Sequence, residues 1–465
     1  MKKEQKNSPN LRFKGFTEDW ELCKLKEITE RVKGNDGRMD LPTLTISAGQ
    51  GWLNQKDRFS GNIAGKEQKN SPNLRFKGFT EDWELCKLGD ITESFSGGTP
   101  QAGNSDYYDG EIPFIRSGEI NDSQTELFIT EKGLNNSSAK IVEKGDILYA
   151  LYGATSGEVG ISQINGAINQ AILAIRPIKE DEPYLIAQWL LKQKESIIRT
   201  YLQGGQGNLS SSIVKELVLK LPKDKAEQAK IGTFFKQLDD TITLHQRKLE
   251  QLKELKKAYL QVMFPAKDER VPKVRFAAFE GEWAHRKLGE ITESFSGGTP
   301  TAGKSEYYGG DIPFIRSGEI SSDSTELFIT ENGLNSSSAK MVKVGDILYA
   351  LYGATSGEVG ISKITGAINQ AILAIRPSKN DNSYLIIQWL RKQKNTIIST
   401  YLQGGQGNLS SSIVKNLIIM LPQNKEEQEK VGIFFKRLDD IITLHQNKLE
   451  QLKDLKTSYL QNMFI

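Results

Sequence analysis

The second half of this chain repeats the first half at a fixed distance of 200 positions. Residues from about Pro72 to Phe264 return as Pro272 to Phe464 without an insertion or a deletion. Between 89 and 220 roughly three residues in four are identical to their counterparts, which is far beyond chance. The interval is too long for a solenoid repeat, so it predicts two whole domains of similar fold, each with a globular body and a following helix.

Each repeat ends in a segment rich in leucine and lysine, 227–264 and 427–464. Apolar residues recur there in alternating steps of four and three, the heptad seam of a coiled-coil helix about 57 Å long. Since a seam of this length needs a partner, we expect the two helices to lie against each other. The predicted seam positions are Leu238, Ile242, Leu249, Leu252, Leu438, Ile442, Leu449 and Leu452, continued outward by Ile231, Phe235, Tyr259, Met263, Val431, Phe435, Tyr459 and Met463. His245, His445, Lys256 and Lys456 fill the remaining seam positions, and we interpret the histidines as polar residues that fix the register.

The bodies, 89–222 and 289–422, are predicted to mix strands and helices. Apolar runs at 112–115, 146–152 and 171–175 are typical of strands, and 184–201 has helical spacing. Glycine-rich loops at 96–100, 152–157 and 203–210 separate these elements. We therefore divide the chain into 1–65, 66–222, 223–265, 266–422 and 423–465.

A short leading segment with fixed Phe, Phe and Trp spacing occurs three times, ending at Trp20, Trp83 and Trp283. Residues 3–25 and 66–88 are identical. Only the second and third occurrences lead into a complete body, whereas 33–65 is polar, rich in glycine and unrelated to the other bodies. We interpret 1–65 as a truncated, poorly ordered remnant of recombination rather than as a working third domain.

Composition describes an ordinary globular protein, with 37% hydrophobic and 26% charged residues among 465. No apolar run is long enough to span a bilayer, and the first residues lack the apolar core of a signal peptide, so we expect a cytoplasmic location. Cys23 and Cys86 occupy the same position in two copies of one segment, which predicts neither a disulfide nor a metal site. A net charge of +3 is too small to indicate a nucleic-acid partner, so any DNA-binding surface must come from local clusters of basic residues.

One motif suggests a nucleotide site and is rejected on its context. Residues 298–305 match the P-loop pattern, but the flanks lack the buried strand and the helix that a phosphate cradle needs. The matching loop of the first half has Asn104 in place of Lys304. Three dispersed histidines exclude a histidine metal cluster, and no nucleophile motif is present, so the sequence predicts a protein without catalytic residues or a metal.

The remaining chemistry lies in the polar loops of the bodies, where Arg can read guanine, Asn and Gln can read adenine, and hydroxyl groups suit phosphates. Asn169 and Gln170 are interpreted instead as a structural pair. Two copies on a rigid spacer favour paired half-site readers of DNA. A protein-binding coiled-coil scaffold without enzymatic activity is the alternative, and an NTPase a third. The candidate DNA-contacting residues are Thr99, Ser105, Tyr107, Arg116, Ser117, Tyr152, Thr155, Ser156, Gln206 and Asn208, with Thr299, Ser305, Tyr307, Arg316, Ser317, Tyr352, Thr355, Ser356, Gln406 and Asn408 in the second half.

In the order of these motifs and in its twofold repeat, the chain resembles the specificity subunit of type I restriction–modification systems. The resemblance covers nearly all of 72–465 and rests on the leading segment, the loops at 96–100, 152–157 and 206–210, the runs 112–116 and 145–148, and the ending 227–264. It implies an α+β fold in which two mixed α/β target recognition domains, related by pseudo-twofold symmetry, are separated by two long antiparallel coiled-coil helices. The chain departs from the family in its 1–65 extension and in the near identity of its two recognition domains.

The resemblance also implies the function and the partners. The subunit would read a bipartite site on double-stranded DNA and dock two adenine-N6 methyltransferase (M) subunits, joined in the restriction complex by endonuclease–translocase (R) subunits. S-adenosylmethionine, ATP and magnesium would belong to those partners, with no cofactor in this subunit. Because the two recognition domains are nearly alike, the expected site is an interrupted palindrome.

Overall fold

The computed structural model describes residues 71–465 except 179, 203–207, 379–380 and 403–407. The chain divides into two compact units at residues 68 and 69, and the second unit contains every described residue. Residues 1–65, interpreted from the sequence as a remnant, lie outside the described part, as do Gln206 and Gln406. The interpretations placed on them stay predictions.

The first half runs from the leading segment 71–83 through a body to one long helix. Its elements in chain order are β1 (Glu84–Lys87), α2 (Leu88–Ile91), β2 (Thr92–Ser96), η2 (Ser105–Tyr107), β3 (Tyr108–Ile115), β4 (Phe128–Ile129), α3 (Glu131–Asn135), β5 (Lys140–Val142), β6 (Ile147–Ala150), β7 (Val159–Ile161), β8 (Gly166–Ile168), β9 (Ile172–Pro177), α4 (Pro183–Tyr201), α5 (Ser211–Lys215), β10 (Val218–Leu221) and α6 (Lys225–Val262).

The second half repeats this order and adds two short 3-10 helices. Its elements are β11 (Ala284–Lys287), α7 (Leu288–Ile291), β12 (Thr292–Ser296), η3 (Ser305–Tyr307), β13 (Tyr308–Ile315), η4 (Ser317–Glu319), β14 (Phe328–Ile329), α8 (Glu331–Asn335), β15 (Lys340–Val342), β16 (Ile347–Ala350), η5 (Gly353–Thr355), β17 (Val359–Ile361), β18 (Gly366–Ile368), β19 (Ile372–Pro377), α9 (Ser383–Tyr401), α10 (Ser411–Lys415), β20 (Ile418–Leu421) and α11 (Lys425–Met463).

Each body contains two four-stranded sheets and a two-stranded one. In the first body the order β2-β9-β6-β7 forms an antiparallel sheet, and β4-β3-β8-β5 forms a mixed sheet in which β3 and β8 run parallel. Strand β1 pairs with β10, which ties the leading segment to the end of the body. The second body has the same three sheets in the same order.

The core of each body follows the period-two pattern of its central strand. In β6, Leu148 and Ala150 face the mixed sheet, where they join Ile168 and other apolar residues of that sheet. Ile147 and Tyr149 face the opposite side, where α4 covers the antiparallel sheet. The antiparallel sheet is therefore the middle layer, buried on both faces.

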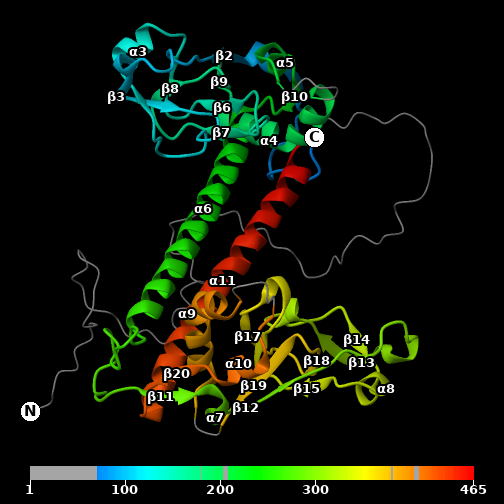
Figure 1. Ribbon diagram of the computed structural model, residues 1–465. Helices are drawn as coiled ribbons and strands as arrows, with labels where there is room; N and C mark the ends of the chain where they lie inside the picture. Colours follow the sequence, from blue (N-terminus) through cyan, green and yellow to red (C-terminus); the bar gives the residue numbers. More distant parts are fainter. Residues whose placement is uncertain (1–70, 179, 203–207, 379–380, 403–407) are drawn as a thin grey trace, which may run out of the picture. The chain divides into compact units, whose positions relative to one another are not determined.

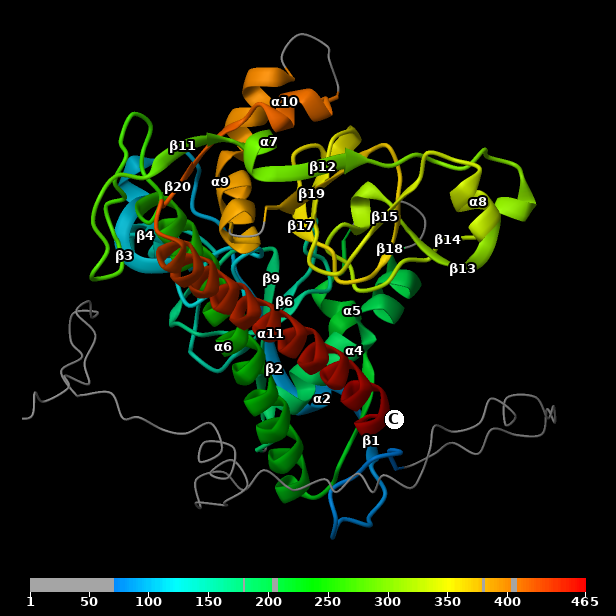
Figure 2. The ribbon, with the colours of Figure 1, turned by 90° about the horizontal axis from the view of Figure 1, so that it is seen from below.

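The helix α4 joins the body to the long helix, and α9 does the same in the second half. Figure 2 shows α9 beside β17 and α11, and both contacts are present in the packing. Pro183 stands in the first turn of α4, where a missing N–H costs nothing. Asp224, after Pro222, begins α6 by accepting a hydrogen bond from the Ala226 N–H at 2.8 Å.

The two long helices, of 38 and 39 residues, pack against each other in opposite directions (Figure 1). Leu249 and Leu252 of α6 form one apolar cluster with Leu438 and Ile442 of α11. The mirrored cluster joins Leu238, Ile242, Leu449 and Leu452. All eight seam residues therefore lie at the predicted interface, related by a pseudo-twofold axis.

The outer ends of the predicted seam have a different partner. Ile231 and Phe235 belong to the core of the first body, and Val431 and Phe435 belong to the core of the second. Met463 packs into the first body and Met263 into the second. The predicted continuation of the seam therefore holds in part. Tyr259 and Tyr459 lie in the helix–helix clusters, and Phe235 and Phe435 contact Phe464 and Phe264 at the end of the partner helix. The same heptad spacing also packs these end residues on the globular cores, which the sequence did not predict.

Polar residues occupy the centre of the seam. His245 and His445 meet at the axis, with 3.0 Å between their Nδ1 atoms. Farther from the axis, the ammonium of Lys256 lies 2.6 Å from Asp439, and that of Lys456 lies 2.7 Å from Asp239. These pairs match only in one alignment of the two helices, which is the kind of contact that fixes register.

The histidine pair predicts a dependence of stability on pH. Burial lowers the pKa of His245, and the adjacent His445 and Lys448 lower it further. Below about pH 6.5 the unfolded chain then binds protons that the folded chain does not, so stability present at neutral pH is lost as the pH falls through that value. We expect the urea midpoint to fall more between pH 7.5 and 5.5 in the natural chain than in a His245→Gln/His445→Gln variant. An equal fall in both proteins would contradict the assignment.

These observations confirm the predicted fold class of two similar mixed α/β domains with two long antiparallel helices. The division of each half at residue 222 or 422 stays a prediction. Body and helix share one hydrophobic core in each half, so structurally they form a single unit.

Candidate nucleic-acid interface

The candidate residues lie on four loop regions of each body. Thr99 follows β2 and donates a hydrogen bond to Gln170 Oε1 at 2.5 Å, and the Thr299–Gln370 distance is 2.7 Å. Both groups of the first pair are exposed. Asn169 was interpreted as structural, and its Oδ1 accepts from the Ala171 N–H, whereas Gln170 is presented at the surface. The bond from Thr99 agrees with a structural role for Gln170, and the exposure of its amide also makes it a candidate for contact with DNA.

The loop that carries Thr99 is shaped by glycine. A Cβ built on Gly97 would lie 1.8 Å from the carbonyl oxygen of Ile168, so only glycine allows this close approach of β2 to β8. The approach brings the 97–100 loop beside the residues between β8 and β9. The Ser-Gly-Gly-Thr-Pro run is therefore a positioning device for Thr99.

The second pair of loops meets through Tyr152 and Asn208. They form an isolated antiparallel bridge, and the Leu209 N–H donates to the Leu151 carbonyl at 2.8 Å. Tyr352 and Asn408 form the same bridge in the second half. The sequence separates these loops by some fifty positions, and the fold places them side by side.

Within the 152–157 loop the hydroxyl groups turn to the main chain. Ser156 Oγ lies 3.4 Å from the Leu151 carbonyl, and Ser356 Oγ lies 3.2 Å from that of Leu351. Thr355 Oγ1 lies 3.4 Å from the Tyr352 carbonyl. These contacts give the serines a structural role in shaping the loop, beside the predicted contact with DNA.

The third region is the end of β3, where Arg116 is already paired. Its Nε and Nη2 contact the Glu119 carboxylate at 3.1 and 2.5 Å. The hydrogen bond from Arg116 lowers the pKa of Glu119 to about 2. Burial alone would raise this pKa, but the bonds from Arg116 and from the Thr125 hydroxyl outweigh it. Arg316 and Glu319 repeat the pair in the second half. The arginine is thus held in a fixed orientation with 46% of its side chain exposed, beside the half-buried Ser117.

The fourth region is the 3-10 helix that carries Ser105 and Tyr107. The Thr130 N–H donates to the Tyr107 carbonyl at 3.0 Å, which fastens this turn to α3. Asn104 caps the turn through its side chain. Ser105 is exposed at its surface.

The second half replaces that cap with Lys304, the lysine of the P-loop match. Its ammonium lies 3.3 Å from the Tyr307 hydroxyl and over the Tyr307 ring. The helix that follows has only three residues, Ser305–Tyr307, so no helix N-terminus converges on a phosphate. The structure agrees with the rejection of a nucleotide site here.

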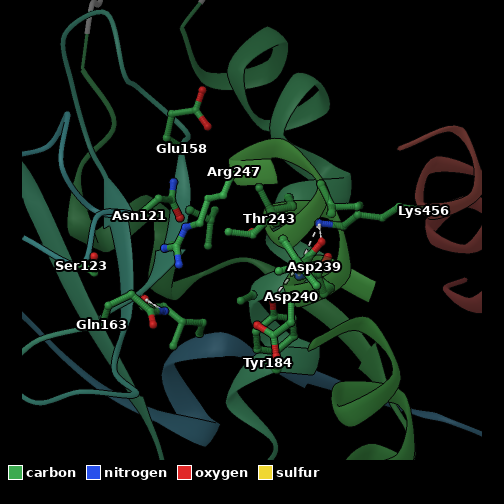
Figure 3. A pocket seen from close by; sticks show the side chains of 18 residues that line it. Asn121, Ser123, Glu158, Gln163, Tyr184, Asp239, Asp240, Thr243, Arg247 and Lys456 are labelled. Atoms are coloured by element: carbon green, nitrogen blue, oxygen red, sulfur yellow. Dashed lines mark hydrogen bonds and ion pairs between the residues drawn. The ribbon is translucent and has the colours of Figure 1, made fainter. Parts of the chain in front are cut away.

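A cleft of about 780 Å³ lies between α4, α6 and β7 (Figure 3). No predicted DNA-contacting residue lines it. Asp239 in its wall accepts hydrogen bonds from the Tyr184 hydroxyl at 2.7 Å, from Gln188 Nε2 at 3.1 Å and from Lys456 Nζ at 2.9 Å. Asp239 therefore joins the body to both long helices, a structural role that its place outside the heptad seam did not reveal.

In 71–465, apart from the gaps given above, no group of three or more His, Cys, Asp or Glu residues could hold a metal ion. Among the same residues, no helix is long and apolar enough to cross a bilayer.

Comparison with known proteins assigns both halves to one family. The family model described as "Type I restriction modification DNA specificity domain" matches residues 80–254 and 280–454, that is, each body with most of its helix. The MjaVIII specificity subunit of Methanocaldococcus jannaschii is 23% identical over 397 residues, which cover 81% of this chain and 90% of the relative. The HindI specificity subunit of Haemophilus influenzae is 22% identical, over 82% of this chain and 99% of the relative.

A solved structure has the same fold. The S subunit of a type I restriction–modification system from M. genitalium superposes with a TM-score of 0.65 at 16% identity, over 85% of this chain and 99% of that chain. At this level of identity the likeness is one of fold. With two matched copies of the family's domain and this shared architecture, the chain belongs to the DNA specificity subunits of type I restriction–modification systems.

Proposed function

We propose that this specificity subunit reads an interrupted palindrome on double-stranded DNA. The observation that carries the proposal is the identity of the candidate contact residues in the two halves. Each candidate residue of the first half has an identical counterpart 200 positions later, from Thr99 and Thr299 to Asn208 and Asn408. The antiparallel helices relate the two sets by a pseudo-twofold axis, so equal readers meet DNA in opposite orientations.

The loops carry the groups that such reading needs. Arg116 can donate two N–H bonds to a guanine, and the amides of Gln170 and Asn208 can pair with an adenine edge. Exposed hydroxyls such as those of Ser105 and Thr99 suit phosphate oxygens, which fix position without carrying sequence information. Release of Arg116 from Glu119 is then part of recognition, because the guanidinium exchanges a carboxylate for a base or a phosphate.

The subunit itself carries no catalytic activity, and the chemistry belongs to its partners. We propose that it docks two methyltransferase subunits and, in the restriction complex, endonuclease–translocase subunits. S-adenosylmethionine, ATP and magnesium would be bound by those partners. The surface of α11 supports this role, since the neighbouring side chains of Ile441 and Leu444 are 43% and 67% exposed and adjacent exposed apolar side chains mark interaction surfaces.

Mapping of methylated adenines in cells that express this chain with its methyltransferase tests the proposal. The expected motif has two half-sites that are reverse complements of each other, separated by a fixed gap. A matched control replaces 89–222 with 289–422, so that both halves carry the same body, and should leave the motif unchanged. Two unrelated half-sites in the natural chain would contradict the palindrome.

The helices predict the length of the gap. A heptad inserted after His245 and another after His445 keep the antiparallel register, and each body moves outward without rotation, because seven residues complete two helical turns. The distance between the two bodies should grow by about 10 Å, which is the length of about three base pairs at 3.4 Å each. Because three base pairs also turn the duplex by nearly a third of a turn, the longer site should be methylated less efficiently than the natural one. Methylation mapping should return the same half-sites at the longer distance. A heptad in α6 alone breaks the register and should abolish methylation, and changed half-sites in the double insertion would refute the spacer role.

A further inference from the structure

The leading segment 71–88 is held to the first body by one buried ion pair. Arg75 Nε and Nη2 contact the two oxygens of Glu227 at 2.6 and 2.7 Å. Glu227 lies at the start of α6 and is wholly buried. Since a buried carboxylate needs a partner, Glu227 makes this position selective for a segment that brings an arginine.

Aromatic and strand contacts complete the attachment. Phe76 packs edge-on against Phe234, with ring centres 6.0 Å apart, and Trp83 packs against Phe464 at 6.4 Å. The Leu74 N–H donates to the Asn462 carbonyl at 2.9 Å. Strand β1 then pairs with β10 along its whole length. The surface formed by α6, β10 and the end of α11 is here called the docking site.

The chain contains a second copy of the segment that fills this site. Residues 8–25 are identical to 71–88, so Arg12, Phe13 and Trp20 can make every contact that Arg75, Phe76 and Trp83 make. We propose that the docking site accepts either copy, and that residues 8–25 are its alternative occupant. The partner of this surface is therefore a named segment of the same chain.

The position at which the two copies begin to differ shows where the chain must re-enter the first body when residues 8–25 replace 71–88. Lys26 stands where the second copy has Gly89, and Arg31 stands where it has Ser94. Ser94 Oγ is buried and has no hydrogen-bond partner, so an arginine charge has no place there. The exchanged chain must therefore return to Gly89 directly after Leu25. Gly89 and Asp90 are exposed, so the intervening residues 26–88 can leave the body there as a loop, which opens the start of α2.

Loop closure decides which copy is bound in the natural chain. The contacts are the same for both copies, but docking the first one closes a loop of 63 residues. The length-dependent part of that cost is a factor of about 500, because it grows as the three-halves power of loop length. The second copy should therefore occupy nearly all molecules, and it is the copy that is docked in the structure. Substitutions that weaken docking of the second copy by more than this factor should make the first copy the preferred occupant of the docking site.

Arg75→Ala with Trp83→Ala supplies that damage. Loss of one partner of a buried ion pair weakens a state by a factor of roughly 150 to 5,000, and a buried tryptophan contributes a comparable factor. The product of these two factors exceeds the roughly 500-fold cost of closing the loop. The first copy should then take the site, and the loss in the unfolding equilibrium constant should stop near 500-fold.

Three further variants of the 465-residue chain serve as controls. Arg12→Ala/Trp20→Ala damages only the first copy and should match the natural chain in stability. All four substitutions together leave no intact copy and should lose far more than 500-fold. Arg275→Ala/Trp283→Ala makes the same change in the second half, which has no identical copy of its own leading segment. Its loss in the unfolding equilibrium constant should therefore exceed 500-fold.

The two cysteines report directly which copy is docked. Cys86 lies on β1, half-buried against the core of the first body, and burial raises the pKa of its thiol, so docking protects it from alkylation. Cys23 is its counterpart in the first copy. Cleavage after glutamate yields 22–27 and 85–93, which differ in sequence and so in mass. We expect protection of Cys86 in the natural chain and its transfer to Cys23 in Arg75→Ala/Trp83→Ala.

Two results would overturn the proposal. One is an equal loss of stability in Arg75→Ala/Trp83→Ala and in the fourfold variant. The other is a Cys23 that stays as reactive in Arg75→Ala/Trp83→Ala as in the natural chain, whatever the stability. Neither readout depends on DNA or on a partner subunit, so the outcome is separate from that of the proposed function.

Discussion

Replacement of Phe435 by alanine is expected to lower the free energy of unfolding by about 3–5 kcal/mol. The side chain is fully buried, and its ring lies 5.2 Å from that of Phe434 and 5.9 Å from that of Phe264. It joins α11 to the core of the second body and to the end of α6. Removal of the ring leaves a cavity among rigid elements that cannot close around it.

Urea unfolding followed by tryptophan fluorescence measures this change, since Trp283 and Trp389 belong to the same core. Leu444→Ala on the same helix is the matched control, because its side chain is 67% exposed and the change should stay within about 0.5 kcal/mol. Equal effects from the two substitutions would show that Phe435 does not join helix and body.

Arg275→Ala is expected to cost about 3–5 kcal/mol, because it leaves Glu427 charged, buried and without its partner. The guanidinium contacts both carboxylate oxygens, at 2.6 and 2.7 Å, and the Glu427 side chain is 1% exposed. Trp283 Nε1 adds a bond to the same carboxylate at 3.3 Å. The second half has no duplicate of its leading segment, so nothing compensates for the loss.

Thermal and urea unfolding of two further variants isolate the cause. Lys87→Ala removes an exposed pair with Glu216 and should cost far less, because solvent screens this pair. Arg275→Ala/Glu427→Gln removes the buried charge as well and should be more stable than Arg275→Ala alone. If the double variant were the less stable one, desolvation of an unpaired carboxylate would not be the source of the loss.

The sequence repeat was sufficient to predict the architecture, because two copies of one pattern must fold alike and their heptad seams need each other. Periodicity could not tell which partner each seam residue meets. Ile231 and Leu238 continue one stripe, yet the first packs on a body and the second on the other helix. An amphipathic pattern records that a face is buried and carries no information about what buries it.

The candidate interface shows the same limit at the level of single side chains. The loops were identified from their polar and glycine-rich composition, and the Tyr152–Asn208 bridge joins two of them. The pairing of Arg116 with Glu119 and of Thr99 with Gln170 was missed, although the first involves neighbours three positions apart. Arg75 and Glu227 lie 152 positions apart, and no local pattern links them. Such pairs are fixed only when the fold brings their elements together.

The crossed attachment of helix ends to bodies has a consequence for the order of folding. The core of the first body includes Met463 and Phe464, whereas that of the second includes Met263 and Phe264. The last buried residue of the second core along the chain is Phe435, whereas the first core also needs Met463 and Phe464. The first body is made earlier, yet its core cannot be completed before that of the second body. This differs from the usual order, in which N-terminal domains complete their folding first.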